Sequence, residues 1–388
     1  MKARTVLLLF LLGMLHFSVY SKKTILDTDK LPLEIYSGKQ GKFHVQGAVV
    51  DLKQGFVYFS FTTKLIKTDL NGKLIGSVDG LTGHLGCLTQ HPGNGKIYGS
   101  LEYKNDNIGK GIRKELGKET EKTDKSGFYI AIFDVDKITR PNMDAEKDGI
   151  VTTVYLKTVV DDYYAKVTNN GKEREHRYGC SGIDGVTFAP RMGKKGNGEE
   201  MMLYVAYGIY GDKDRTDNDY QVLLAYDIEK WGKYESPLSQ QKKQLSGPKK
   251  PDARYFLYTG NTNYGIQNLT FDPFSKNIYA AVYKGAKTQY PNYSLFVINT
   301  QIPPRKEKLK GINQKGMVLS LLEAGKKDPA TSIRGWDFPW GSTGMSAIGD
   351  GYFYISHNGI TPKDKQQYTR LILYKWIGNE QVAFELCR

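Results

Sequence analysis

The chain has 388 residues, with 55 Lys and Arg against 41 Asp and Glu, and a formal net charge of +14. A basic surface favours anionic partners such as phosphates, acidic glycans or lipid headgroups. The lysines are scattered among acids, so solubility is the simpler explanation, and this pattern argues against nucleic acid as a partner. After the first residues no segment approaches the roughly 20 apolar residues of a membrane-spanning helix. We therefore expect no membrane span.

The first 21 residues are typical of a secretory signal peptide. Lys2 and Arg4 supply the positive start, residues 6–15 the apolar run, and residues 19–21 a small-residue cleavage site. The apolar run is roughly half the length of a bilayer-spanning helix, although an uncleaved anchor remains the alternative. We predict a secreted protein, extracellular or periplasmic, whose residues 22–388 form a single domain and stay monomeric.

One sequence pattern then occurs five times along the chain. A small, Gly-containing apolar segment leads into a turn, and the turn leads into a strand centred on Tyr. The five copies lie at residues 46–61, 86–101, 184–207, 267–282 and 344–356. Internal repetition on this scale indicates an array of identical supersecondary units.

Two further short segments follow each copy, rich in β-branched and aromatic residues and bounded by Gly, Pro, Asn and Asp, as strands are. The third segments lie at 64–70, 128–135, 221–228, 294–299 and 370–376. The fourth segments lie at 73–78, 152–159, 255–259, 317–322 and 381–386. Helical patterns are nearly absent, with weak ones at 134–138 and 228–231. Five repeats of four antiparallel strands predict an all-β fold, a β-propeller of five four-stranded blades.

The spacing of the copies leaves six blades as an alternative. Tyr98 and Tyr204, at the centres of consecutive copies, are about 106 residues apart, and the gap holds insertions at 104–126 and 161–180. Residues 33–38 resemble residues 256–260, a fourth strand that precedes an inner strand. We therefore expect the N-terminal and C-terminal strands to pair and close the ring, because an open ring would leave unpaired backbone groups on two blades.

The three cysteines leave at least one thiol unpaired in an exported chain. Cys87 and Cys180 stand in the inner segments of consecutive repeats, so one disulfide between them is possible, with Cys387 left over. No CxxC, HExxH, GxSxG or Gly-rich phosphate loop occurs. Metal binding and nucleophilic catalysis therefore have no motif of their own in this sequence.

Residues at the start of the inner strands should surround the central tunnel, on the face that carries the long polar loops. Histidines stand at the same position of the first two repeats. With acid and amide groups from later blades, they could hold a divalent metal or act as an acid/base pair near neutral pH. They could equally hydrogen-bond the neighbouring backbone and only complete the rim. The candidates are His44, Gln46, His84, Asp184, Gln267 and Asn268.

Tyrosines stand at equivalent exits of three second strands. Tyr103, Tyr207 and Tyr283 would suit stacking against sugars or other flat ligands. The acid-rich stretch 212–219 could be a calcium loop, but its basic residues offset the charge, and a solvated loop is the simpler interpretation. We therefore expect the three tyrosines to form stacking walls at the tunnel mouth and this stretch to be a solvated loop.

The segments DGVTFAP at 184–190 and TFDP at 270–273, each before an aromatic or aliphatic strand with a central Tyr, resemble exported β-propeller proteins. That superfamily includes gluconolactonases, paraoxonases, strictosidine-synthase-like proteins and YVTN-type surface repeats. Its calcium-dependent lactonases use an acid and asparagines around the tunnel. The resemblance implies Glu102, Asp184 and Asn268 as metal ligands and a divalent cation such as calcium as cofactor, whereas His44 and His84 depart from the pattern.

The sequence leaves three functions open. The first is binding of a small polar, sugar-like or anionic ligand, or a glycan, at the tunnel mouth. The second is a metal-dependent hydrolase of esters, lactones or phosphoesters, with Asp184 and Asn268 as metal ligands and His84 as general base. The third is a surface module for protein recognition. Whether the protein is an enzyme stays undecided, with His84 and Asp184 as the catalytic candidates.

Overall fold

The computed structural model describes residues 26–118, 125–193 and 200–388. The predicted signal peptide lies outside the described residues. The chain divides into two compact units, residues 1–31 and residues 32–388. The described part of the first unit holds one 3-10 turn, η1 (Thr28–Lys30). All the strands of the described residues lie in the second unit.

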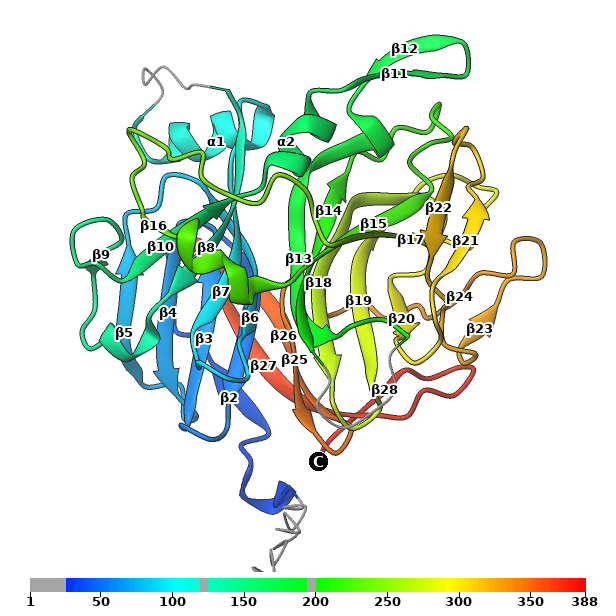
Figure 1. The fold of residues 1–388 in the computed structure, drawn as a ribbon. Helices are drawn as coiled ribbons and strands as arrows, with labels where there is room; N and C mark the ends of the chain where they lie inside the picture. The colour runs from blue at the N-terminus through cyan, green and yellow to red at the C-terminus, as the bar shows by residue number, and fades with distance from the viewer. Residues whose placement is uncertain (1–25, 119–124, 194–199) are drawn as a thin grey trace, which may run out of the picture. The chain divides into compact units, whose positions relative to one another are not determined.

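The second unit is a five-bladed β-propeller (Figure 1). The first blade consists of β2 (Val45–Asp51), β3 (Phe56–Phe61), β4 (Lys64–Asp69) and β5 (Leu74–Asp79). The second consists of β6 (His84–Gln90), β7 (Ile97–Tyr103), β8 (Gly127–Phe133) and β10 (Val151–Tyr155). The third consists of β13 (Cys180–Pro190), β14 (Met201–Ile209), β15 (Tyr220–Tyr226) and β17 (Ala253–Tyr258).

The last two blades depart slightly from this plan. The fourth consists of β18 (Thr262–Asp272), β19 (Asn277–Lys284) and β20 (Leu295–Asn299). The fifth consists of β25 (Met345–Gly349), β26 (Tyr352–Ile360) and β27 (Gln367–Trp376), with β1 (Glu34–Tyr36) and β28 (Phe384–Leu386) sharing its outer edge. Short extra strands extend the edges: β9 (Met143–Asp144), β16 (Ser236–Pro237), β21 (Arg305–Lys308) and β22 (Lys315–Val318).

The ring is closed in the way the sequence predicts. The inner strands contact one another in the order β2, β6, β13, β18, β25 and back to β2. The N-terminal β1 pairs antiparallel with β27, where Glu34 faces Ile372. The C-terminal β28 takes the remainder of the same edge, where Leu386 faces Tyr374. Five blades and closure by the two chain ends are both confirmed.

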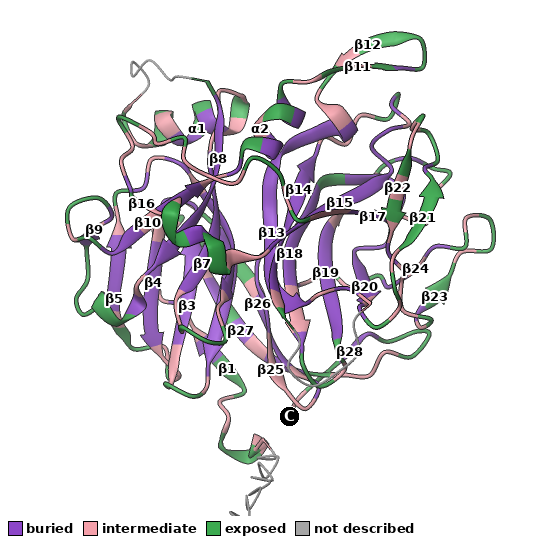
Figure 2. Ribbon diagram, in the orientation of Figure 1, coloured by how far each residue is buried: buried purple, intermediate pink, exposed green. Residues whose placement is uncertain are grey.

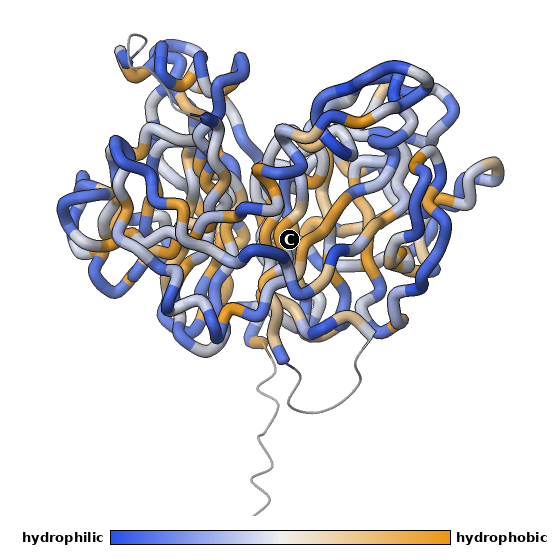
Figure 3. Tube along the Cα trace, turned by 45° about the horizontal axis from the view of Figure 1, so that its top comes forward, coloured by the Kyte–Doolittle hydropathy of each residue, from blue (hydrophilic) through white to orange (hydrophobic). Residues whose placement is uncertain are grey.

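The blades pack against one another through their central strands, which are buried on both faces (Figure 2). The repeated tyrosines are part of this packing, since Tyr58, Tyr204, Tyr279 and Tyr354 are almost fully buried. Hydrophobic residues accordingly follow the strands and hydrophilic ones the connecting loops (Figure 3). At Gly47, where the inner strands of the first two blades meet, there is no room for a side chain. A Cβ on Gly47 would lie 2.8 Å from the backbone nitrogen of Leu88 in the next blade.

The structure differs from the prediction in two of the fourth strands, in the pairing of one and in the length of the other. Segment 317–322 was expected in the fourth blade, but β22 pairs parallel with β17 and extends the third blade instead. It does so because it forms a hairpin with β21, and only Leu321 bridges to Ile298 in the fourth blade. The strand predicted at 152–159 ends at Tyr155, and a short helix, α2 (Lys157–Tyr163), begins two residues later.

The insertions hold structure that no periodic pattern predicted. Helix α1 (Asn107–Glu115) begins at Asp106, whose side chain accepts a hydrogen bond from the Gly109 amide at 3.0 Å. Its two glycines lower its helix propensity, so the sequence signal is weak. The hairpin of β11 (Lys166–Asn169) and β12 (Lys172–Glu175) fills the other insertion, while the weak helical patterns are 3-10 turns, η2 (Val135–Lys137) and η4 (Ile228–Lys233). Among the described residues, no helix has the length and apolar character needed to cross a membrane.

Candidate functional site

A cavity of about 600 Å³ lies at the propeller axis, on the face where the inner strands begin. The sequence places the functional site on this face, because it carries the long polar loops. Its walls come from the starts of β2, β6, β13 and β18, from the ends of β7 and β19, and from α1. Strands from four blades and one inserted helix therefore build a single space.

The structure brings most of the predicted rim residues together in this cavity. Those that line it are His44, Gln46, His84, Glu102, Asp184, Gln267 and Tyr283. They come from four blades, which meet here because every inner strand starts beside the axis. The predicted encirclement of one opening is therefore observed, and the role of these residues in binding remains a prediction.

Three predicted residues lie elsewhere. Tyr207 is fully buried and donates its hydroxyl to Asp162 at 2.7 Å, so it belongs to the core between blades and cannot form a stacking wall. Asn268 is buried beneath the cavity, where its amide donates to the carbonyls of Gln46 and Ser342. Asn268 therefore ties blades together, and it does not line the cavity. Tyr103 lines a neighbouring cavity instead of the axial one.

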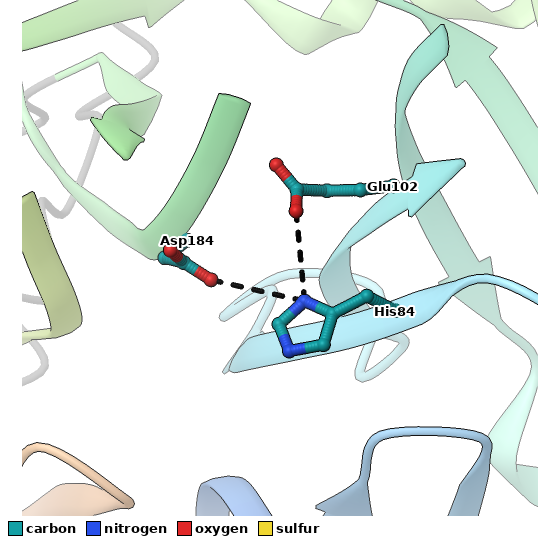
Figure 4. A group of neighbouring side chains, drawn as sticks. All are labelled: His84, Glu102 and Asp184. Carbon is teal, nitrogen blue, oxygen red and sulfur yellow. Dashed lines mark ion pairs between the residues drawn. The ribbon is translucent and has the colours of Figure 1, made fainter. Parts of the chain in front are cut away.

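Three side chains converge at the edge of the axial cavity (Figure 4). The Nδ1 atom of His84 lies 3.6 Å from Oε2 of Glu102 and 3.9 Å from Oδ1 of Asp184. One potential ligand atom from each of the three lies within 4.8 Å of the others. His84 Nδ1 is buried and makes no hydrogen bond with any described residue. A buried nitrogen that faces two carboxylates without a hydrogen bond is an arrangement that can hold a cation or exchange a proton.

The strands explain why these three side chains meet. His84 on β6 and Glu102 on β7 face each other directly in the antiparallel register, so their side chains emerge side by side. Asp184 reaches them from β13, which packs beside β6. The site also needs a glycine at position 182, because a Cβ there would come within 1.9 Å of Oε1 of Glu102.

Glu102 is held as a charged carboxylate. Its Oε1 accepts a hydrogen bond from the Ile183 amide at 2.6 Å, and its Oε2 lies 2.9 Å from the ammonium of Lys104. Burial opposes the charge, but Lys104 and His84 outweigh it and hold the pKa of Glu102 below its ordinary value. Burial also opposes the charge of Lys104, yet the acids around it raise the pKa of that ammonium. The two form a buried ion pair at the wall of the cavity.

The pKa of Asp184 is shifted in the opposite direction from that of Glu102. Burial and the negative charge of Glu102 raise the pKa of Asp184 to about 7. Its Oδ2 accepts a hydrogen bond from Gln267 at 3.1 Å, while Oδ1 faces His84. Near neutral pH this carboxyl can therefore carry a proton or release it.

The acidic stretch 212–219 holds its own cation. The ammonium of Lys287 donates to the carbonyl of Arg215, to Oδ1 of Asn218 at 2.8 Å and to Oδ1 of Asp219 at 2.5 Å. All four side chains are buried. The expectation of a solvated loop holds for Lys213 and Asp214, which are exposed, and not for residues 217–219, which are buried. Asp217 pairs with Arg215 and Asp219 with Lys287, so these two acids already have cationic partners.

The disulfide that the sequence leaves possible is not formed: Cys87, Cys180 and Cys387 are all free thiols. Cys87 and Cys180 are buried, and the thiol of Cys87 points at the carbonyl of Val186, 3.5 Å away. Burial raises the pKa of Cys87 to about 11, so this thiol is not a nucleophile near neutral pH.

No protein-family model and no curated protein matches the chain. Among solved structures, a luciferin-regenerating enzyme is 14% identical, with 91% of this chain and 98% of that one covered, at a TM-score of 0.33. An arabinanase of Cellvibrio cellulosa complexed with arabinohexaose is 11% identical, with 89% and 96% covered, at 0.37. Regucalcin of Agrobacterium tumefaciens, a calcium-binding protein, is 10% identical, with 92% and 98% covered, at 0.32. All are distant likenesses, and no function is transferred from them.

Sequence reasoning missed several residues that line the axial cavity. Lys104 pairs with Glu102, and the two stand two positions apart on an extended segment, a spacing that places side chains on the same face. That spacing is the sequence feature from which Lys104 could have been predicted as a neighbour of Glu102. Ile108 and Ile112 of α1 also line the cavity. Nothing in the repeat pattern pointed to them, because the helix belongs to an insertion.

Proposed function

We propose that this propeller binds a small polar ligand in its axial cavity, at a divalent cation held by His84, Glu102 and Asp184. The observation that carries the proposal is the convergence of one imidazole nitrogen and two carboxylates, in which His84 Nδ1 is buried without a hydrogen bond. Buried polar atoms normally make hydrogen bonds, so a nitrogen that lies between two acids and makes none calls for a further partner. A cation supplies it.

The donor set bears on which cation binds. Imidazole nitrogen suits zinc and similar transition metals, whereas calcium takes six to eight oxygens. One nitrogen and two carboxylates therefore favour zinc or manganese over the calcium that the resemblance implies. With Asp184 ionised, the two acids and Lys104 give the centre a formal charge of −1, which attracts a cation.

Thermal unfolding of EDTA-treated protein tests this site. Zinc or manganese should raise the Tm of the wild type by a few °C at saturating concentration, because a ligand bound only to the folded state stabilises it. The His84→Ala variant should lose this shift. His44→Ala is the matched control, since His44 lines the same cavity outside the three-residue cluster, and it should keep the shift. An equal shift in His84→Ala, or none in the wild type with any divalent cation, would refute the proposal.

A second candidate, hydrolysis of esters, lactones or phosphoesters, is favoured by the unequal carboxyls. Neighbouring acids whose pKa values are pushed apart are suited to acid/base roles. In this role Glu102, which stays charged, and His84 would hold the cation, and Asp184, whose carboxyl is raised in pKa by burial and by Glu102, would accept a proton from an attacking water instead of holding the cation. A bound cation would polarise the substrate oxygen.

A panel of such substrates, assayed with and without zinc or manganese, tests the hydrolase. We expect cation-dependent turnover that falls roughly 100-fold or more in Asp184→Asn, the scale of a lost general base. The far-UV spectrum and Tm of the variant must show a folded protein. Turnover that is unchanged in Asp184→Asn would exclude this role.

A further inference from the structure

Tyr264 lines the axial cavity from an irregular point of β18. On the neighbouring strand β19, Tyr283 pairs with Asn263, but the adjacent residue of β19 pairs with Ile266. Tyr264 and Gly265 therefore have no partner on β19 and form a β-bulge. Bulges commonly lie next to functional sites, where they redirect a side chain.

The backbone of this bulge is left-handed at two consecutive residues. The φ angle is 62° at Tyr264 and 74° at Gly265. Position 265 requires glycine, because a Cβ there would lie 2.4 Å from the carbonyl oxygen of Tyr207. A bulky side chain is rare at such φ values and carries strain, and residues with this kind of strain gather at ligand-binding positions. The backbone of Tyr264 therefore calls for a role of its side chain.

The ring of Tyr264 does not belong to the core. Its exposed fraction is 43%, and among the described residues its side chain has no hydrogen-bond partner and stacks on no other ring. By contrast, Tyr204 of the repeat is fully buried and donates its hydroxyl to the carbonyl of Pro190 at 2.9 Å. A strained aromatic residue that is displayed in a cavity in this way is available to a ligand.

One amide connects the bulge to the three-residue cluster. Nε2 of Gln267 donates to the carbonyl of Tyr264 at 2.9 Å and to Oδ2 of Asp184 at 3.1 Å. The position of Tyr264 is thereby fixed relative to that of Asp184. Phe43 and Tyr283 line the same space of about 600 Å³ and give it further aromatic surface. A single small molecule can therefore reach both the ring of Tyr264 and the cluster.

We propose that the ligand of the axial cavity carries a flat ring that stacks on Tyr264, and that oxygen substituents of this ring reach the axial cation. Tyrosine offers a large apolar face, on which an aromatic ring stacks in an offset arrangement. The apolar face of a sugar ring has the same complementarity. The clause on the cation rests on the proposed function, whereas stacking on Tyr264 does not.

Two hydroxamates measure this stacking in the zinc-loaded protein. Benzohydroxamate and acetohydroxamate present the same zinc-chelating group, with and without a ring. By calorimetric titration the wild type should prefer benzohydroxamate, and Tyr264→Asn should reduce that preference by roughly threefold to tenfold, the range of an aromatic contact. Tyr264→Phe should keep the preference. Intrinsic differences between the two compounds cancel, because every protein is titrated with both.

The variants are chosen to separate binding from folding. Asn adopts a left-handed φ more readily than Tyr, so the Tm of Tyr264→Asn should not fall. Tyr164→Asn is the matched control, since the Tyr164 ring is 47% exposed and lies outside the axial cavity. An unchanged preference in Tyr264→Asn, or an equal loss in Tyr164→Asn, would overturn the inference. A fall in the Tm of Tyr264→Asn by more than a few °C would also overturn it, because the ring would then serve packing.

Competition against benzohydroxamate identifies the ring. Benzoate and glucuronate carry the same carboxylate on an aromatic ring and on a sugar ring, and the better competitor names the class. The effect of zinc on the Tm tests the cation independently. Zinc stabilisation without a ring preference would refute the stacking alone. If zinc does not stabilise the protein, the proposed function fails, and benzoate titrated into EDTA-treated wild type and Tyr264→Asn then decides the stacking by itself: weaker binding to the variant supports it, and equal or absent binding refutes it.

Discussion

The Glu102→Gln variant is expected to be less stable than the wild type by about 3 kcal/mol at pH 7.5. The substitution keeps the shape of the side chain but leaves the buried ammonium of Lys104 without its closest counter-charge, at 2.9 Å. Breaking a buried ion pair on one side costs about 3–5 kcal/mol. We place the cost at the low end because Asp106, 3.7 Å from the ammonium, still compensates part of it. Urea denaturation of the two proteins measures the difference.

A double-mutant cycle shows whether the cost comes from Lys104. Adding Lys104→Met to Glu102→Gln removes the uncompensated charge, so the double variant should be more stable than the sum of the two single costs predicts. We expect a coupling free energy of about 2 kcal/mol. Costs that simply add would show that Glu102 and Lys104 do not stabilise each other, and that the effect arises from the weaker hydrogen bond that an uncharged side chain accepts from the Ile183 amide.

Asp184 should make the cation-free protein less stable as the pH rises from 5 to 7.5. The pKa of Asp184 is raised to about 7 in the folded protein by burial and by Glu102, above its value of about 3.9 when unfolded. Its contribution to stability is therefore complete below pH 4 and is lost as the pH rises through 7. The expected loss between pH 5 and 7.5 is about 3 kcal/mol, at about 1.4 kcal/mol per pKa unit.

Asp184→Asn isolates this effect, because Asn cannot titrate and its oxygen can still accept the hydrogen bond from Gln267. Urea denaturation in EDTA at pH 5 and pH 7.5 should show the loss in the wild type and not in the variant. Zinc or manganese should also suppress it in the wild type, since a bound cation favours the ionised carboxylate. Equal pH dependence in the two proteins would show that Asp184 does not titrate in this range.

The part of the site that the sequence predicts is the part that the repeat generates. His44, His84, Asp184 and Gln267 occupy equivalent places at the starts of inner strands, and a propeller brings such places together at its axis. Their proximity follows from the architecture, so an internal comparison of the repeats found them. The tyrosines were harder to place, because second-strand exits include both cavity walls and contacts between blades. Tyr283 lines the axial cavity, whereas Tyr207 is in the core.

The amino-acid sequence by itself favoured five blades, with six as the alternative, and the closure of the ring, because strand patterns, turns and glycines are local features that repeat. Only the tertiary structure decided which charges meet. His84 faces Glu102 through the register of one hairpin, and Asp184 joins them by packing of the next blade. Lys104 and α1 come from an insertion with no counterpart in other repeats. Their charges and pKa values depend on distances and burial across blades, which no periodicity in a single sequence encodes.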